Sequence, residues 1–194
     1  MDRTTPKATS VVQSGEPDDF AIGTGFWDER DWGGTARLVV SVPPERLAEV
    51  HHALLGVLGS PLGVLYRQLV DRREPRPEGA PSRDFVALEI GPSRVMSGLA
   101  SAADLVYHDA RHELWVRGPH ADQVVLDADG LLYCYPDDPA FRDVLAAAGI
   151  PEEKVEAMST RDYVKHWFHA ECDAQEDALI AGLELTEVAP QRHG

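Results

Sequence analysis

The stretch from Asp122 to Ile150 constrains the fold more than any other part of the chain. An apolar run, Gln123–Leu126, and an aromatic-rich run, Leu131–Tyr135, are separated by Asp127-Ala128-Asp129-Gly130. This four-residue segment is a turn sequence, because its glycine adopts positive φ without steric cost. Two such runs around a short turn predict a β-hairpin. Pro136 has no amide hydrogen with which to extend the second strand. The hairpin requires an antiparallel pair of strands in the fold.

A helix is predicted directly after this hairpin. Asp137 or Asp138 can cap it, and Pro139 suits its first turn. One apolar stripe follows at helical spacing: Phe141, Val144, Leu145 and Ala148. Gly149 is placed to end the helix. The signals along this segment agree with one another, and together they predict a strand–turn–strand–helix unit.

The remaining patterns predict one α+β domain over residues 25–188. We expect a largely antiparallel sheet of about six strands, with three to four helices mainly on one face. The other expected strands are 37–42, 62–70, 84–90 and a segment around 114–116, with 183–188 as an optional last strand. The other expected helices are 44–58, 91–104 and 173–182, with a short one near 163–168. Residues 1–24 are predicted to be a disordered or loosely docked tail, and residues 189–194 a loose tail.

The charge of the chain restricts its partners. The net charge is −15, and thirteen acidic but only four basic residues lie in 137–188. Such a field repels nucleic acid and anionic membranes and speeds encounter with a basic protein. The alternative is that the acidity serves solubility alone. No apolar run is long enough to span a membrane, and the N-terminus lacks the apolar core of a signal peptide. We therefore expect a cytoplasmic protein, and two cysteines are too few for a disulfide framework.

The turn sequence also raises a catalytic alternative. Val124 to Leu132 resembles the first motif of haloacid-dehalogenase-type phosphatases, in which an apolar strand precedes Asp-x-Asp-Gly-Thr. That resemblance implies a nucleophilic Asp127 and an acid/base Asp129. Against it, Leu131 stands in place of the threonine, and the residues after Gly130 continue as a strand. We favour the hairpin turn.

Two histidine clusters are candidate metal ligands. His108 and His112 have the spacing that brings two imidazoles to one face of a helix, as in zinc hydrolases. We expect a turn and a strand here instead, on which the two rings diverge. His166, His169 and Cys172 form the second cluster. Packed or hydrogen-bonded histidines are the favoured interpretation of both clusters, and no cofactor is predicted.

Four segments of the chain resemble a set of small uncharacterised bacterial proteins. They are 61–66 (PLGVLY), 109–115 (DARHELW), 129–135 (DGLLYCY) and 169–173 (HAECD). The resemblance covers about residues 36–185 and implies one compact domain. It carries no activity and no site residues to this chain.

We predict a non-enzymatic acidic binding protein. Its most concrete form is an immunity-type inhibitor that covers a basic partner such as a toxin nuclease. The candidate contact residues are aromatic or acidic: Trp27, Trp32, Asp137, Asp138, Glu152, Glu153, Trp167 and Glu171. For the two N-terminal tryptophans, covering an edge of the core is the favoured alternative. A metal-dependent hydrolase built from the histidines, and a small-ligand or scaffold module, remain further alternatives. No catalytic residue is assigned.

Overall fold

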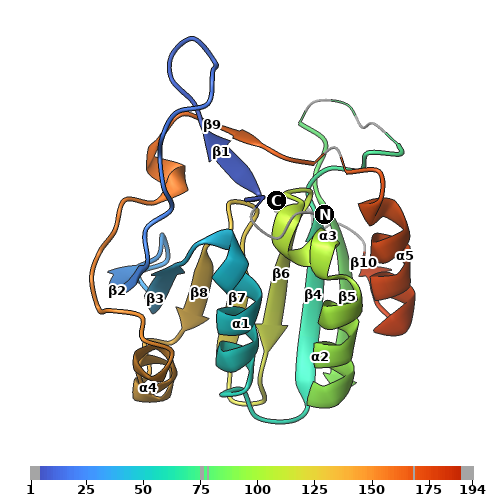
Figure 1. Ribbon diagram of the computed structural model, residues 1–194. Helices are drawn as coiled ribbons and strands as arrows, with labels where there is room; N and C mark the ends of the chain where they lie inside the picture. The colour runs from blue at the N-terminus through green and yellow to red at the C-terminus, as the bar shows by residue number, and fades with distance from the viewer. Residues whose placement is uncertain (1–4, 75–76, 78, 168, 189–194) are drawn as a thin grey trace.

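The computed structural model describes residues 5–74, 77, 79–167 and 169–188. It is an α+β structure built on an eight-stranded antiparallel sheet of order β10-β5-β4-β6-β7-β8-β3-β2, with a separate two-stranded sheet, β1-β9 (Figure 1). The strands are β1 (Ala8–Ser10), β2 (Gly25–Arg30), β3 (Ala36–Ser41), β4 (Leu62–Gln68), β5 (Arg83–Ile90), β6 (His112–Arg117), β7 (Gln123–Leu126), β8 (Leu132–Tyr135), β9 (Tyr163–Lys165) and β10 (Thr186–Val188).

Five α-helices pack against this sheet. They are α1 (Pro44–Leu55), α2 (Pro92–Ser101), α3 (Ala103–His108), α4 (Pro139–Ala147) and α5 (Cys172–Gly182), and a 3₁₀ helix, η1, spans Met158–Thr160. In Figure 1, α1, α2 and α3 lie in front of the sheet, α4 lies below β2, β3 and β8, and α5 lies at the opposite side near β10. None of the helices in the described part of the chain has the length and apolar character needed to cross a bilayer.

The main core lies between the helices and one face of the sheet. Alternate residues of the central strands, such as Tyr66, Leu114 and Leu126, are fully buried there against Leu54 and Leu105 of the helices. The opposite face carries a second, smaller apolar cluster over β2, β3 and β8. The sheet therefore has one face covered by helices and one largely uncovered face.

The predicted hairpin and its helix are confirmed. β7 and β8 pair from Gln123 opposite Tyr135 to Leu126 opposite Leu132. In the turn between them, the Asp127 carboxylate accepts the amides of Asp129 and Leu131, both at 2.8 Å, and Gly130 has φ +86°. Such side-chain hydrogen bonds stabilise a tight turn and leave the adjoining strands in register.

The α4 helix begins as its sequence predicted. Asp138 is the N-cap, and its side chain accepts the amide of Ala140 at 2.8 Å. Phe141 and Leu145 are its buried residues, and Gly149 follows its C-terminus with φ +70°. Capping and the apolar stripe act within a few residues, which explains why the sequence alone located this helix.

The sheet is larger than the predicted six strands. β1 and β2 were not predicted, and the optional last strand is realised as the three-residue β10. The short helix predicted near 163–168 was wrong, because residues 163–165 form the strand β9, which pairs with β1. β2 has the sequence GFWDER, in which only the first half is apolar, because its second half runs along the exposed edge of the sheet. β1 and β9 are three residues each and pair across more than 150 residues of chain, so neither carries a local pattern.

The N-terminal segment predicted to be loose is partly built into the fold. Ala8 to Ser10 form β1, and the side chain of Lys7 is buried. In addition, the predicted helix 91–104 is two helices, α2 and α3, and reaches His108. The predicted tail 189–194 lies outside the described residues.

Candidate functional site

A buried ionic network joins α5 to the sheet. Arg111 lies in the connection between α3 and β6, and its guanidinium makes two 2.9 Å hydrogen bonds to Asp109. It also donates to Asp173 at 2.8 Å, to Glu176 at 3.2 Å, and to the carbonyl of His169 at 2.9 Å. All five residues come from two short segments that the fold brings together.

The carboxylate of Glu176 is saturated by further donors from β4. The Tyr66 hydroxyl donates to Glu176 Oε1 at 2.6 Å, and Gln68 Nε2 donates to the same oxygen at 2.9 Å. Buried charges are tolerated when their hydrogen-bonding capacity is used in this way. The network therefore acts as a structural clamp, in which the five N–H groups of the Arg111 guanidinium donate to Asp109, Asp173, Glu176 and the His169 carbonyl.

A second set of buried or partly buried charged side chains lies around the β7–β8 turn. Lys7 donates to the carbonyl of Val106 at 3.2 Å, and burial lowers the pKa of its amine to about 8. Burial, together with the neighbouring charge of Asp129, raises the pKa of Asp127 to about 6. Lys165 pairs with Asp129 at 2.8 Å. These contacts hold the N-terminal segment and β9 against the turn.

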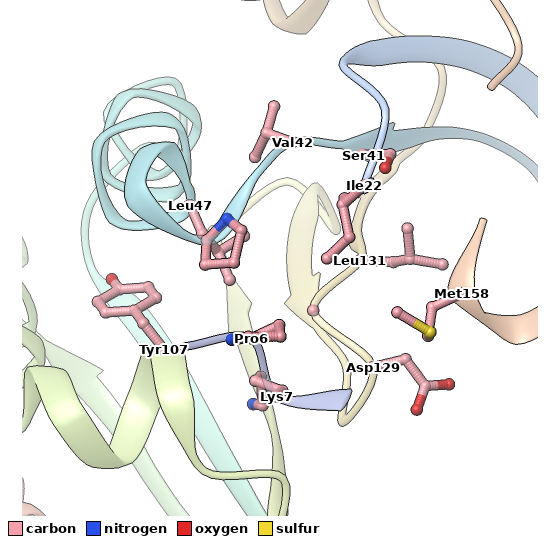
Figure 2. A pocket seen from close by; sticks show the side chains of 12 residues that line it. Pro6, Lys7, Ile22, Ser41, Val42, Leu47, Tyr107, Asp129, Leu131 and Met158 are labelled. Atoms are coloured by element: carbon pink, nitrogen blue, oxygen red, sulfur yellow. The ribbon is translucent and has the colours of Figure 1, made fainter. Parts of the chain in front are cut away.

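The pocket beside this turn is small. Figure 2 shows Lys7 and Tyr107 on one side of it and Asp129, Leu131 and Met158 on the other. Its volume of about 10 Å³ is room for about one water molecule. The carboxylate of Asp127 is occupied by two amides and, at 3.1 Å, by the Tyr133 hydroxyl. Asp127 is therefore a turn-forming residue here.

The first histidine pair is split between two elements. His108 ends α3, where its Nδ1 hydrogen-bonds the carbonyl of Thr5 at 2.7 Å. His112 begins β6 and is fully buried, stacked on Tyr66 with ring centroids 4.8 Å apart. Burial, with the charges of Lys7 and Arg111, lowers the pKa of His112 well below its usual value. The two rings do not share a helix face.

The second cluster is also dispersed. His166 Nε2 and the Thr9 hydroxyl are 2.7 Å apart. The backbone carbonyl of His169 accepts a hydrogen bond from the Arg111 guanidinium. Cys172 is the first residue of α5, and burial raises the pKa of its thiol to about 12. Among the described residues, no three His, Cys, Asp or Glu side chains are grouped so as to hold a metal ion.

Several of the predicted contact residues lie along the edge of the sheet formed by β2 and β3, in a region that we call the acidic end and define as residues 28–35, 137–143 and 151–153. The Asp137 amide donates to the carbonyl of Ala36 at 3.3 Å, and the Phe26 amide to the carbonyl of Pro151 at 3.0 Å. These bonds set the start of α4 and the 151–153 segment beside the β2–β3 hairpin. The acidic end carries these exposed acids: Asp28, Asp138, Asp143, Glu152 and Glu153.

The two N-terminal tryptophans have opposite environments. Trp27 is 8% exposed and packs in the smaller apolar cluster on Val39 and Leu131, so it does cover the core. Trp32 is fully exposed at the tip of the β2–β3 hairpin. There Asp31 Oδ1 accepts the amides of Gly33 at 2.9 Å and Thr35 at 2.8 Å, which fixes the turn that presents Trp32.

The remaining predicted contact residues lie elsewhere. Glu171 is exposed at the start of α5, on the opposite side of the sheet from α4 in Figure 1. Trp167 is half-buried in the segment that follows β9. The structure therefore places Trp32, Asp137, Asp138, Glu152 and Glu153 along the β2–β3 edge of the sheet, and Glu171 at α5.

The acidity of the C-terminal stretch is partly neutralised in the fold. Arg72 pairs with Asp173, Arg73 with Asp177 at 2.8 Å, and Arg83 with Glu187 at 2.7 Å. Arg72, Arg73 and Arg83 therefore balance acidic residues of α5 and β10. At the acidic end, Arg142 pairs with Asp137 at 2.8 Å and with Glu152, while no ion pair of the described residues uses Asp28, Asp143 or Glu153.

A cleft on the outer face of β2, β3 and β8 was not predicted. It has a volume of about 480 Å³ and is lined by those strands and by residues 154–160. The sequence contained one indication of it: Tyr133 and Tyr135 are two residues apart in a strand, so their side chains lie on the same face of the sheet. Its other wall comes from a segment with no regular pattern, which only the tertiary structure brings to this face.

Comparisons of the chain with known protein families, with curated proteins and with solved structures found no match.

Proposed function

We propose that the protein is a non-enzymatic binding protein whose acidic end covers a basic protein partner. A toxin nuclease bound by an immunity-type inhibitor is the concrete form of this proposal. The observation that carries it is Trp32, a large aromatic side chain held in full exposure on an ordered turn.

The chemistry around Trp32 supports a protein partner. Exposed tryptophans act as anchors because a large apolar area enters the partner with little loss of side-chain entropy. The exposed acids of the acidic end lie along the same edge of the sheet as this anchor, and such acids raise the rate of encounter with a basic surface. The histidines proposed for a hydrolase are held in separate contacts among the described residues, so no observation favours that alternative.

The test begins with identification of a partner. Tagged wild-type protein and a Trp32→Ala variant are used at low salt to capture proteins from the native host. The protein that depends on Trp32 is then purified, and its affinity is measured by calorimetry at several salt concentrations. We expect a basic partner, at least about tenfold weaker binding by Trp32→Ala, and weaker binding at high salt.

Leu88→Ala is the matched control. Leu88 is also a large exposed apolar residue, but it lies on β5, away from the acidic end. Both variants should keep the stability of the wild type within about 0.5 kcal/mol, because both side chains are on the surface. The proposal fails if the recovered partner is acidic, if no partner depends on Trp32, or if Leu88→Ala weakens binding equally.

A further inference from the structure

The cleft on the outer face has the form of a small-molecule site. Residues Trp27, Val39 and Leu131 form its apolar floor, and residues 154–160 form the facing wall. Its volume of about 480 Å³ lies within the range of about 300–1,000 Å³ that is typical of ligand pockets. It lies on the side of the sheet opposite α1, α2 and α3, outside the main core.

Its aromatic side chains suit a flat ring. Trp27 and Tyr133 both line the cleft, and the Arg37 guanidinium lies 4.1 Å from the centroid of the Tyr133 ring. Stacked aromatic and guanidinium planes favour a third planar group beside them. A planar ring would also fill the space over the apolar floor without needing donors or acceptors there.

The charges that face the cleft favour an anion. Glu29 is paired with Arg37, and Glu156 is paired with Arg161 at 2.8 Å. Lys154 is exposed at the cleft and takes part in no ion pair of the described residues. The one lining charge without a partner in this part of the structure is therefore positive.

Hydrogen-bond donors in the lining add to this preference. Arg37 has five N–H groups, of which three donate to Glu29 and Tyr135. Nothing among the described residues accepts a hydrogen bond from Trp27 Nε1, although this atom is buried. Ser159 presents an exposed hydroxyl on the opposite wall. A ligand with acceptor oxygens would satisfy such donors.

We propose that this cleft binds a small molecule that joins a planar aromatic ring to an anionic group. The ring lies over Trp27 and Tyr133, and the anion lies near Lys154 and Arg37. This site does not depend on the binding of a basic protein to the acidic end. Aromatic carboxylates and nucleoside monophosphates share the required chemistry, and the test distinguishes them.

The test compares four probes by calorimetry on the full chain. Indole-3-acetate and adenosine monophosphate carry the anion, while indole-3-acetamide and adenosine keep the ring without a charge. We expect at least one anionic probe to bind about tenfold or more tightly than its counterpart. Preference for one of the two anionic probes identifies the ligand class. The proposal is overturned if neither anion binds more tightly than its counterpart.

Two pairs of variants locate the site. Ser159→Trp fills the cleft and should abolish binding of the anionic probe, while Ser93→Trp, on the exposed side of α2, should not change it. Lys154→Gln should weaken the anionic probe several-fold and leave the uncharged probe unchanged. Arg117→Gln removes an exposed cation outside the cleft and should have no effect. Equal losses in a variant and its control would place binding elsewhere and overturn the proposal.

Discussion

Arg111 and Asp109 form a bidentate ion pair in which both side chains are 0% exposed. The two residues are separated by Ala110 alone, and their hydrogen bonds are 2.9 Å each. The pair fixes the tight connection from α3 to β6. Arg111 Nη1 also donates to Asp173 and Glu176 of α5. The residue that forms the local pair with Asp109 therefore also binds a helix that is distant in the sequence.

Loss of the Arg111 charge should destabilise the protein strongly. An Arg111→Met variant keeps much of the apolar volume but leaves Asp109 buried without its counter-charge. Breaking a buried ion pair in this way costs about 3–5 kcal/mol. Urea unfolding followed by circular dichroism measures the loss. Arg117→Met, at the exposed end of the same strand, is the control and should change stability by less than about 0.5 kcal/mol. Similar losses for both variants would show that the network contributes little.

The stability of the fold should depend on His51 below neutral pH. His51 is fully buried on α1, its Nδ1 lies 3.1 Å from the Tyr107 hydroxyl, and burial, with smaller contributions from the charges of His52 and Lys7, lowers its pKa to about 3. A folded pKa below the unfolded value of about 6.5 gives stability that is present above pH 6.5 and is lost as the pH falls. The loss between pH 7 and pH 5 is about 2 kcal/mol for this one group.

His51→Gln should remove the contribution of His51 to the pH dependence of stability, because the variant side chain does not titrate. The measurement is the free energy of unfolding near pH 7 and near pH 5 for wild type, His51→Gln and, as control, the exposed His120→Gln. Asp127, with a pKa raised to about 6, opposes the trend, since its contribution is lost as the pH rises; it is present in all three proteins and cancels. An unchanged pH dependence in His51→Gln would contradict the prediction.

A methyl group at Gly25 should displace the segment that borders β2. A Cβ atom there would lie 2.4 Å from the carbonyl oxygen of Glu153 and 3.1 Å from a methyl of Val155. The backbone of that segment must move to admit it, which costs about 1–3 kcal/mol. Thermal unfolding measures the cost of Gly25→Ala. Gly182→Ala, where nothing lies within 4 Å of the added methyl, should be neutral or slightly stabilising. Equal stability of the two variants would show that the segment adapts freely.

The fold was predicted where structure depends on neighbours in the chain. The turn at Asp127 to Gly130, the Asp138 cap and the apolar stripe of α4 each act over a few residues. The edge strand β2, which pairs with the next strand β3, was missed because its composition is mixed. The short strands β1 and β9 were missed because each has three residues and pairs with a segment more than 150 residues away. The candidate site was predicted to the same extent. The sequence showed which residues are acidic or tryptophan, but it did not show that Trp32 is exposed and Trp27 is buried.

The sequence by itself determined an α+β domain with a central hairpin, a capped helix and a strong acidic excess, because propensity, capping and charge are properties of local segments. Tertiary structure decided where that excess acts. It paired acids of α5 and β10 with Arg72, Arg73 and Arg83, and it left those of the acidic end exposed. It also placed residues 154–160 over β2, β3 and β8 to form the cleft. Such contacts join segments many residues apart, and no local pattern encodes which of them meet.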